Sequence, residues 1–266
     1  MCQPECHAEV AVTVYRVERV MQGPVRVDVN SAVVAYRPAE GEERILAARD
    51  VKPAALLSGH PWRTFRSYLG QRHYSGTYWT ATLGRHVIYE SRLELANLIG
   101  ADFDSGVKKI AAQPFMLTAE VDGQLRRHTV DYVWGTDDNL VVVDVVRRER
   151  LTHCEVQLLC TWTRMVVEYM GWTYLVASEP ARVWMSNVRF LAGYRREWLV
   201  NGEVLTDLRS RMDQIAGQSI SGTESALARY PKPLVRPALM HLLWSQELIC
   251  DLSEPLRRAT VLEVST

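Results

Sequence analysis

Three acidic residues in the middle of the chain have the types and spacing of a metal-binding site. Glu94 lies in a segment with helical periodicity, Asp131 lies in an extended segment, and Asp144 follows thirteen positions later among valines. A carboxylate in such an apolar strand is costly to bury without a cation, a hydrogen-bonding network or a metal. Carboxylates that converge from neighbouring elements can hold Mg²⁺ or Mn²⁺. Such an ion activates water and stabilises charge on a scissile phosphate.

A second interpretation explains Asp144 without a metal. In it, Asp144 lies at the end of its strand and pairs with Arg147 or Arg148. The spacing fits both interpretations equally. His128 precedes Asp131 by three residues, and in a continuous strand the two side chains face opposite sides. We therefore expect His128 to be packed or solvent-exposed rather than a ligand.

The segments around these acids alternate between helical and extended patterns. Asp122-Gly123 is a strong hairpin signal, and the short apolar run around Asp144 is typical of a strand buried on both faces. The predicted elements are, in order, a helix over 89–100 ended by Gly100, a strand over 107–121 broken near Gln113-Pro114, a return strand over 125–134, a strand over 140–146, a helix over 153–170 and a strand over 172–178. Strand–helix–strand predicts a parallel crossover, so we expect a mixed α/β sheet flanked by helices.

The two ends of the chain have different patterns of apolar and polar residues. Residues 8–36 alternate apolar and polar side chains, which predicts strands. After residue 200, three short helices over 205–215, 223–230 and 235–247 precede two strands over 248–252 and 260–264. Helices followed by a small hairpin are typical of a winged helix, which binds DNA or protein. The pattern does not choose between these partners.

Residues 51–89 contain no Asp or Glu. Aromatic residues alternate there with cations, which include Lys52, Arg63, Arg66, Arg72 and Arg85. A nucleic-acid groove uses this combination. A locally packed layer of arginines on aromatic rings explains it as well.

The amino-acid composition limits the class of protein but does not identify a binding partner. The 266 residues carry 31 basic and 31 acidic side chains, so net charge neither supports nor excludes nucleic acid. No apolar run is long enough to span a bilayer and no secretory signal is visible, so we expect a cytoplasmic protein without a disulfide framework. Cys2, Cys6 and His7 lack a nearby fourth metal ligand and are expected to be free.

The joint order of several short motifs resembles the TnsA-like heteromeric transposase endonuclease family. The resemblance covers roughly residues 60–196, with a looser likeness in the tail. The motifs are Pro61-Trp62-Arg63, Glu90-Ser91-Arg92-Leu93-Glu94, Gln113-Pro114-Phe115, Arg127-His128-Thr129-Val130-Asp131-Tyr132, Val141-Val142-Val143-Asp144-Val145, Thr163-Arg164, Gly171-Trp172, Glu179-Pro180 and the run from Asn187 to Arg196. Each motif is weak alone, but their order is specific.

The resemblance implies a restriction-endonuclease-like core with a PD-(D/E)xK signature. Such subunits cut the 5′ ends of a mobile element beside a DDE transposase, and an AAA+ regulator is a further candidate partner. Glu94, Asp131 and Asp144 match the family's metal-binding acids, and the backbone carbonyl of Val145 adds a candidate ligand for one or two Mg²⁺ or Mn²⁺ ions. This places the nuclease domain at 59–197, between a strand-rich extension at 1–58 and a winged-helix-like domain at 198–266.

One position departs from the family pattern, because the lysine of the signature falls on Val146. Valine neither positions the attacking water nor offsets charge in the transition state. If the strand continues, Arg148 faces the same side as Asp144, so Arg148 is our candidate substitute. Candidate contacts to double-stranded DNA are Arg63, Arg66, Arg72, Arg85, Arg195 and Arg196.

Three functions follow from these residues. The first is a metal-dependent nuclease with a migrated cation. The second is a catalytically degenerate subunit that binds DNA and the transposase, and the third is a DNA-binding regulator that uses the winged helix alone. The sequence has no Gly-rich phosphate loop, so it does not indicate ATP use by this chain.

Overall fold

The computed structural model describes residues 14–15, 25–63 and 74–265. It is a mixed α/β protein whose contacts divide it into two units, Met1–Glu179 and Pro180–Thr266. This division lies at 179/180, whereas the predicted boundary lies at 197/198. Helix α4 (Arg182–Leu191) belongs to the second unit because it packs against α8 (Lys232–Trp244). Among the described residues, no helix is both long and apolar enough to cross a membrane.

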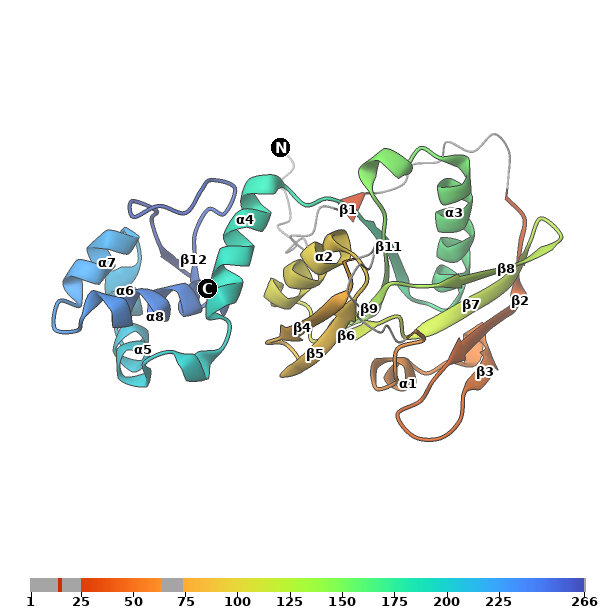
Figure 1. The fold of residues 1–266 in the computed structure, drawn as a ribbon, viewed down its shortest axis with the longest axis horizontal. Helices are drawn as coiled ribbons and strands as arrows, with labels where there is room; N and C mark the ends of the chain where they lie inside the picture. Colours follow the sequence, from red (N-terminus) through yellow and green to blue (C-terminus); the bar gives the residue numbers. More distant parts are fainter. Residues whose placement is uncertain (1–13, 16–24, 64–73, 266) are drawn as a thin grey trace, which may run out of the picture. The chain divides into compact units, whose positions relative to one another are not determined.

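The first unit is built on a five-stranded sheet in the order β1-β11-β10-β9-β6 (Figure 1). Strands β10 and β11 are parallel and α3 connects them, so the predicted crossover is confirmed; the other pairs are antiparallel. The strands are β1 (Val14–Tyr15), β6 (Lys109–Ala112), β9 (Tyr132–Gly135), β10 (Leu140–Val145) and β11 (Thr173–Ala177), and the helix is α3 (Cys154–Tyr169).

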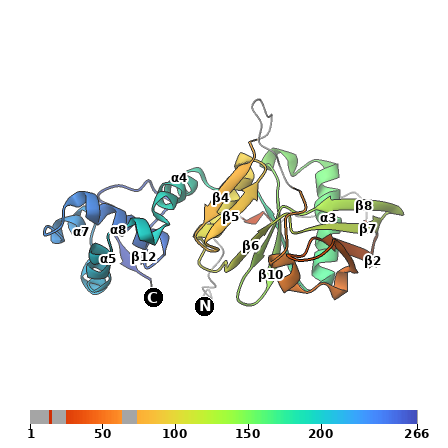
Figure 2. The same cartoon turned by 60° about the horizontal axis from the view of Figure 1, so that its bottom comes forward.

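A second sheet of four strands has the order β3-β2-β7-β8. Its strands are β2 (Val27–Tyr36), β3 (Arg44–Ala47), β7 (Phe115–Val121) and β8 (Gln124–Thr129), and Figure 2 shows β7 and β8 side by side. The alternation in the N-terminal segment does form strands. Because β2 pairs with β7 and buries Val34 and Tyr36 in the shared core, this segment is part of the first unit rather than a separate extension.

The chain passes between the two sheets at a corner formed by Gln113 and Asp131. The predicted break near Gln113 is confirmed between β6 and β7, but the predicted return strand over 125–134 is also broken, because β8 ends at Thr129 and β9 begins at Tyr132. The backbone N–H of Gln113 donates to the carbonyl of Asp131 at 2.8 Å, and Gln113 has a φ of 46°. This corner carries Asp131 to the end of β10.

The two faces of the five-stranded sheet have different neighbours. One face packs on α3, where Val142, Trp162 and Tyr174 belong to a core shared with β2 and β7. The other packs on α2 (Arg92–Phe103) and the hairpin of β4 (Gly76–Thr80) and β5 (Arg85–Tyr89). Helix α2 continues past the predicted stop at Gly100 to Phe103. This last turn buries Ala101 and Phe103, and their burial favours its continuation.

Short elements complete the first unit: η1 (Ala48–Asp50), α1 (Pro53–Leu57) and η2 (Arg148–Arg150).

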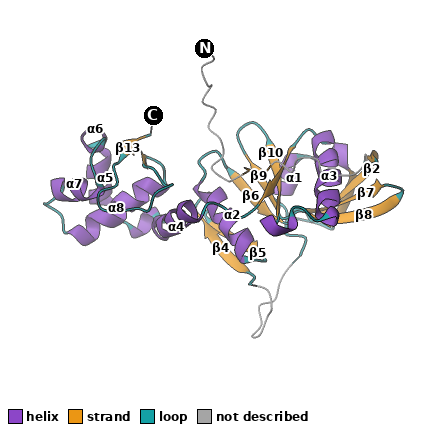
Figure 3. Ribbon diagram, turned by 90° about the horizontal axis from the view of Figure 1, so that it is seen from above, coloured by secondary structure: helices purple, strands orange, loops and turns teal. Residues whose placement is uncertain are grey.

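The second unit is largely helical (Figure 3). The remaining elements, in order, are η3 (Ala192–Tyr194), η4 (Glu197–Leu199), α5 (Gly202–Arg209), α6 (Met212–Ile215), α7 (Ile220–Ala226), β12 (Leu248–Ile249) and β13 (Glu263–Val264). The first predicted helix is two helices, α5 and α6, and the predicted strands form a short antiparallel pair. Helices followed by a paired hairpin are thus present in the expected order.

Candidate functional site

Asp131 and Asp144 lie next to each other at the end of β10. The last pair of the β9–β10 ladder joins Tyr132 and Val143, so each acid stands one residue beyond it. The backbone N–H of Asp131 donates to Asp144 Oδ1 at 3.4 Å, and the N–H of Val145 donates to Asp131 Oδ2 at 2.7 Å. The corner between the two sheets therefore produces an adjacency that sequence distance does not suggest.

Glu94 lies in the first turn of α2. Ser91 caps this helix, since its Oγ accepts from the N–H of Glu94 at 3.1 Å. In return, Glu94 Oε2 accepts from the N–H of Glu90 at 2.7 Å. This reciprocal arrangement resembles a capping box, and the helix dipole favours the negative charge there. Glu94 thus has a helix-capping role whether or not it binds a cation.

The pKa of Asp131 depends on the neighbouring carboxylates, including that of Glu94. Burial, then the nearby carboxylates of Asp144 and Glu94, raise the pKa of Asp131 well above its ordinary value. Burial, together with Glu90, raises the pKa of Glu94. Burial, then the carboxylates of Glu94, Asp131 and Glu90, raise the pKa of Tyr132. Like charges that approach without a compensating cation oppose ionisation, so this region is one where a bound cation would stabilise the ionised acids.

Asp144 points to the face of the five-stranded sheet that packs on α3, opposite the face covered by α2. It is 2% exposed, and its Oδ2 lies 2.5 Å from Tyr174 Oη and 2.8 Å from His128 Nε2. Its strand neighbour Val142 packs in the α3-side core. Tyr132 instead reaches towards β5, with its hydroxyl 3.4 Å from the carbonyl of Ile88. In the described ranges, no three His, Cys, Asp or Glu side chains are arranged to hold a metal ion.

His128 and Tyr174 are site residues that sequence reasoning missed. His128 is packed, as expected, with its ring edge-on to Trp162 at 6.3 Å between centroids, but it also contacts Asp144. The argument from alternation did not apply because the chain turns at Val130 and Asp131. The alternative pairing of Asp144 with arginine is not what stabilises it, since Arg147 lies 3.6 Å from Glu149 and Arg148 contacts Glu179.

Arg148 does not occupy a strand position. Strand β10 ends at Val145, so the alternation that placed Arg148 beside Asp144 stops before it. The N–H of Arg148 donates to Glu179 Oε2 at 2.9 Å, and its guanidinium donates to the Glu179 carbonyl at 3.2 Å. Val146, where the resemblance leads us to expect a lysine, packs partly buried against the core.

The nearest lysines in sequence, Lys108 and Lys109, lie at the far end of β9. Lys109 pairs with Gly135, and the N–H of Lys108 donates to the carbonyl of that glycine. Asp131 precedes the opposite end of the same strand. These lysines therefore do not replace the missing cation beside Asp131.

Gln113 lies beside the acids on the α2 side. It is 5% exposed, and its side-chain N–H donates to Glu90 Oε1. Within the described residues, Gln113 Oε1 is buried without a hydrogen-bond partner. The Gln113-Pro114 break was visible in the sequence as a backbone signal, but the contact with Glu90 depends on the corner.

The hairpin β4–β5 is fixed by one buried carboxylate on α2. Asp102 accepts hydrogen bonds from Tyr78 Oη at 3.0 Å, from the N–H of Ala81 at 3.0 Å and from the N–H of Thr82 at 2.8 Å. Arg85, a predicted DNA contact, is exposed at the start of β5. Asp102 therefore positions the hairpin that presents Arg85.

The other predicted DNA contacts come from both units. Arg63 is exposed, whereas Arg66 and Arg72 lie outside the described residues, as do Cys2, Cys6 and His7. Arg195 donates to the carbonyl of Ala192, and Arg196 lies 6.0 Å from the ring centroid of Trp198.

The aromatic rings of the 51–89 segment contact cations from outside it. The guanidinium of Arg37 lies 5.1 Å from the centroid of Trp62, and that of Arg92 lies 4.7 Å from the centroid of Tyr74. For these two rings, the structure agrees with the alternative in which arginines pack on the aromatic rings of this segment.

A comparison with protein-family models finds no match for this sequence, and a comparison with curated proteins finds none either. The assignment of a function therefore depends on the geometry and chemistry of the site.

Proposed function

We propose that this chain is a metal-dependent DNA endonuclease subunit of the TnsA-like heteromeric transposase type, with a restriction-endonuclease-like core in the first unit. It would hydrolyse a phosphodiester at the 5′ ends of a mobile element beside a DDE transposase. The observation that carries the proposal is the adjacency of Asp131 and Asp144 at the end of β10; the carboxylate of Glu94, from a third part of the first unit, also raises the pKa of Asp131.

The donor set suits a hard divalent cation in type. Carboxylate and carbonyl oxygens are the ligands that Mg²⁺ and Mn²⁺ prefer, and burial, then the carboxylates of Asp144 and Glu94, raise the pKa of Asp131. Glu94, Asp131 and the backbone carbonyl of Val145 are the groups that would hold the ion, and Asp144 would have only its Oδ1 to offer, because Tyr174 and His128 bind its Oδ2. When bound, the ion would supply water activation and charge neutralisation.

The side chains have distinct roles in this proposal. The N–H of Val145 orients the carboxylate of Asp131, and Ser91 fixes the backbone of Glu94. Tyr174 and His128 hold Asp144 through Oδ2, so they set the direction of its other oxygen. With valine at 146, the chain supplies no lysine to accept a proton there, and deprotonation of the attacking water would depend on the carboxylates.

A catalytically degenerate subunit is the second candidate. Three observations favour it. His128 and Tyr174 are hydrogen-bonded to Oδ2 of Asp144, Arg148 contacts Glu179, and Val146 carries no charge. In that case the acids are structural, and the chain binds DNA and the transposase without cutting. A regulator that acts through a winged helix is the third candidate, supported by the helices followed by the β12–β13 pair.

A cleavage assay separates these candidates. Wild type and Asp131→Asn would be incubated with supercoiled plasmid and Mg²⁺ or Mn²⁺, with Asp138→Asn, an exposed turn residue, as the matched control. The nuclease proposal expects nicking by wild type and the control, and at least a 100-fold loss in Asp131→Asn. Equal nicking by all three proteins would reject this site. Binding of DNA without nicking by any of them would support the degenerate subunit.

A further inference from the structure

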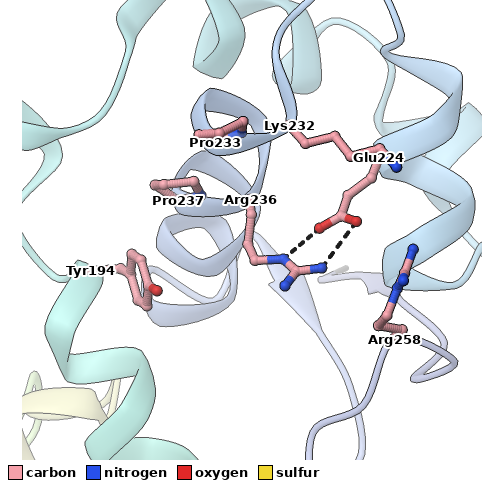
Figure 4. Close-up of a pocket in the computed structure, with 7 residues that line it drawn as sticks. All are labelled: Tyr194, Glu224, Lys232, Pro233, Arg236, Pro237 and Arg258. Atoms are coloured by element: carbon pink, nitrogen blue, oxygen red, sulfur yellow. Dashed lines mark hydrogen bonds and ion pairs between the residues drawn. The ribbon is translucent and has the colours of Figure 1, made fainter.

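Two adjoining hollows open on the second unit. The first, of about 380 Å³, has an apolar wall formed by Tyr194, Pro233 and Pro237 (Figure 4). The second, of about 370 Å³, has an apolar wall that includes Phe190, which is 48% exposed, and Leu256. Both volumes fall within the range of sites that enclose a small ligand or a bulky side chain. Arg236 and Arg258 line both hollows and therefore lie between them.

Four cations surround these hollows: Lys232, Arg236, Arg257 and Arg258. Their one acidic neighbour in the lining is Glu224, which is 3% exposed and forms a bidentate pair with Arg236 at 2.6 and 3.1 Å. In the described part of the chain, no ion pair involves the other three cations. In a chain with no net charge, this is a local positive excess. We call the hollows and cations the basic groove.

Hydrogen bonds fix the backbone of the loop that carries Arg257 and Arg258. Asn187, which is 6% exposed, donates to the carbonyls of Leu252 and Glu254 at 2.9 and 2.8 Å. The N–H of Ser221 donates to the carbonyl of Arg258 at 2.9 Å. The loop that carries Arg257 and Arg258 is thus fixed at both sides, and a ligand loses little affinity to ordering of the loop.

We propose that the basic groove binds an acidic segment of a partner protein, with bulky apolar side chains on both sides of its carboxylates. The two hollows receive the apolar side chains, and Arg236, Arg258 and their neighbours face the carboxylates between them. Charge complementarity of this kind selects the partner and its register, while apolar anchors in pockets supply most of the affinity. This inference does not depend on nuclease activity.

The shape of the basic groove favours a peptide over DNA. A duplex presents phosphates on a convex surface, and these are contacted by cations and polar groups. Phosphates gain nothing from the apolar walls formed by Phe190, Leu256 and the two prolines. A peptide with mixed apolar and acidic side chains uses both the walls and the cations.

The test begins with selection from a random dodecapeptide display library against the full chain. We expect enriched sequences with carboxylates flanked by aromatic or large aliphatic residues. The consensus peptide, synthesised with a fluorophore, would then be titrated by fluorescence anisotropy. The Arg257→Glu/Arg258→Glu variant should weaken binding by at least about 10-fold. Phe190→Ala should weaken it by at least about 5-fold, because a pocket anchor is truncated.

Controls separate loss of binding from loss of folding. Arg182→Glu removes an exposed arginine at the start of α4, outside both hollows, and should bind within about 2-fold of wild type. A peptide with lysines in place of its acids should not bind. The proposal is overturned if enriched peptides carry no acids, or if the double variant, folded by circular dichroism, binds like wild type. It is also overturned if a 30-base-pair duplex, but no selected peptide, loses affinity in that variant.

Discussion

Removal of the Tyr174 hydroxyl tests whether the hydrogen bond from Tyr174 stabilises the buried side chain of Asp144. In Tyr174→Phe, Asp144 loses the donor 2.5 Å from its Oδ2. Asp144 is 2% exposed and Tyr174 is 7% exposed, so water does not readily take the place of the hydroxyl. A hydrogen bond to a charged group contributes about 1.5–3 kcal/mol. We therefore expect the free energy of unfolding of the first unit to fall by about 2 kcal/mol.

The assay is urea denaturation followed by tryptophan fluorescence, because Trp162 packs against His128 in the same region. Tyr169→Phe is the matched control: its hydroxyl donates to Asn30 Oδ1 at 3.0 Å from a side chain that is 38% exposed, so its removal should cost less than about 0.5 kcal/mol. A double-mutant cycle with Asp144→Asn should give a coupling energy of about 1–2 kcal/mol. If Tyr174→Phe is as stable as Tyr169→Phe, the reasoning about Asp144 is refuted.

Three further predictions address other buried groups. Asp102→Ala should destabilise the first unit by about 2–4 kcal/mol, because several donors, including the N–H of Thr82, lose their acceptor; hydrogen exchange over residues 76–89 should rise, and unchanged protection would contradict this role. The pKa of Asp131 is raised in the folded chain, so the folded state binds the extra proton between the unfolded and folded pKa values. Stability should fall as pH rises through that window, and Asp131→Asn should flatten the dependence in thermal melts. Burial raises the pKa of Cys160 to about 11, so at pH 8 its thiol should resist alkylation while the exposed Cys154 reacts; mass spectrometry that finds both modified equally in native protein would contradict the burial of Cys160.

Local patterns predicted most elements of the first unit. The helix around Glu94, the buried strand around Asp144 and the parallel crossover followed from periodicity and turn residues, because each element is specified by neighbours in sequence. The return strand over 125–134 was the main error. The hairpin signal at Asp122-Gly123 predicts a return strand, but the residues that follow do not reveal that the chain leaves one sheet after Thr129 and enters another at Tyr132.

The candidate site was less predictable than the fold around it. Spacing and resemblance predicted a shared site for Glu94, Asp131 and Asp144, and this stays a prediction; the contacts of Asp144 with His128 and Tyr174 depend on tertiary packing. Arg148 shows the same limit, since its proposed position depended on a strand that ends three residues earlier. The return strand over 125–134 and the position of Arg148 failed because a strand was extended beyond its true end, whereas the helix expected to stop at Gly100 was predicted too short.

The hairpin of β7 and β8 leads from Gln113 back to Asp131. The number of residues in each of its strands therefore determines where Asp131 lies at the corner. Strands β7 and β8 are closed by Asp122-Gly123 with matched arms, from the pair Met116–Thr129 to the pair Val121–Gln124. An inserted residue within one arm would shift every pair between it and the corner and turn side chains to the opposite face. Length changes in this ribbon are therefore compatible with the site when they occur at the tip or equally in both arms, so the tip can vary while the base must keep its register.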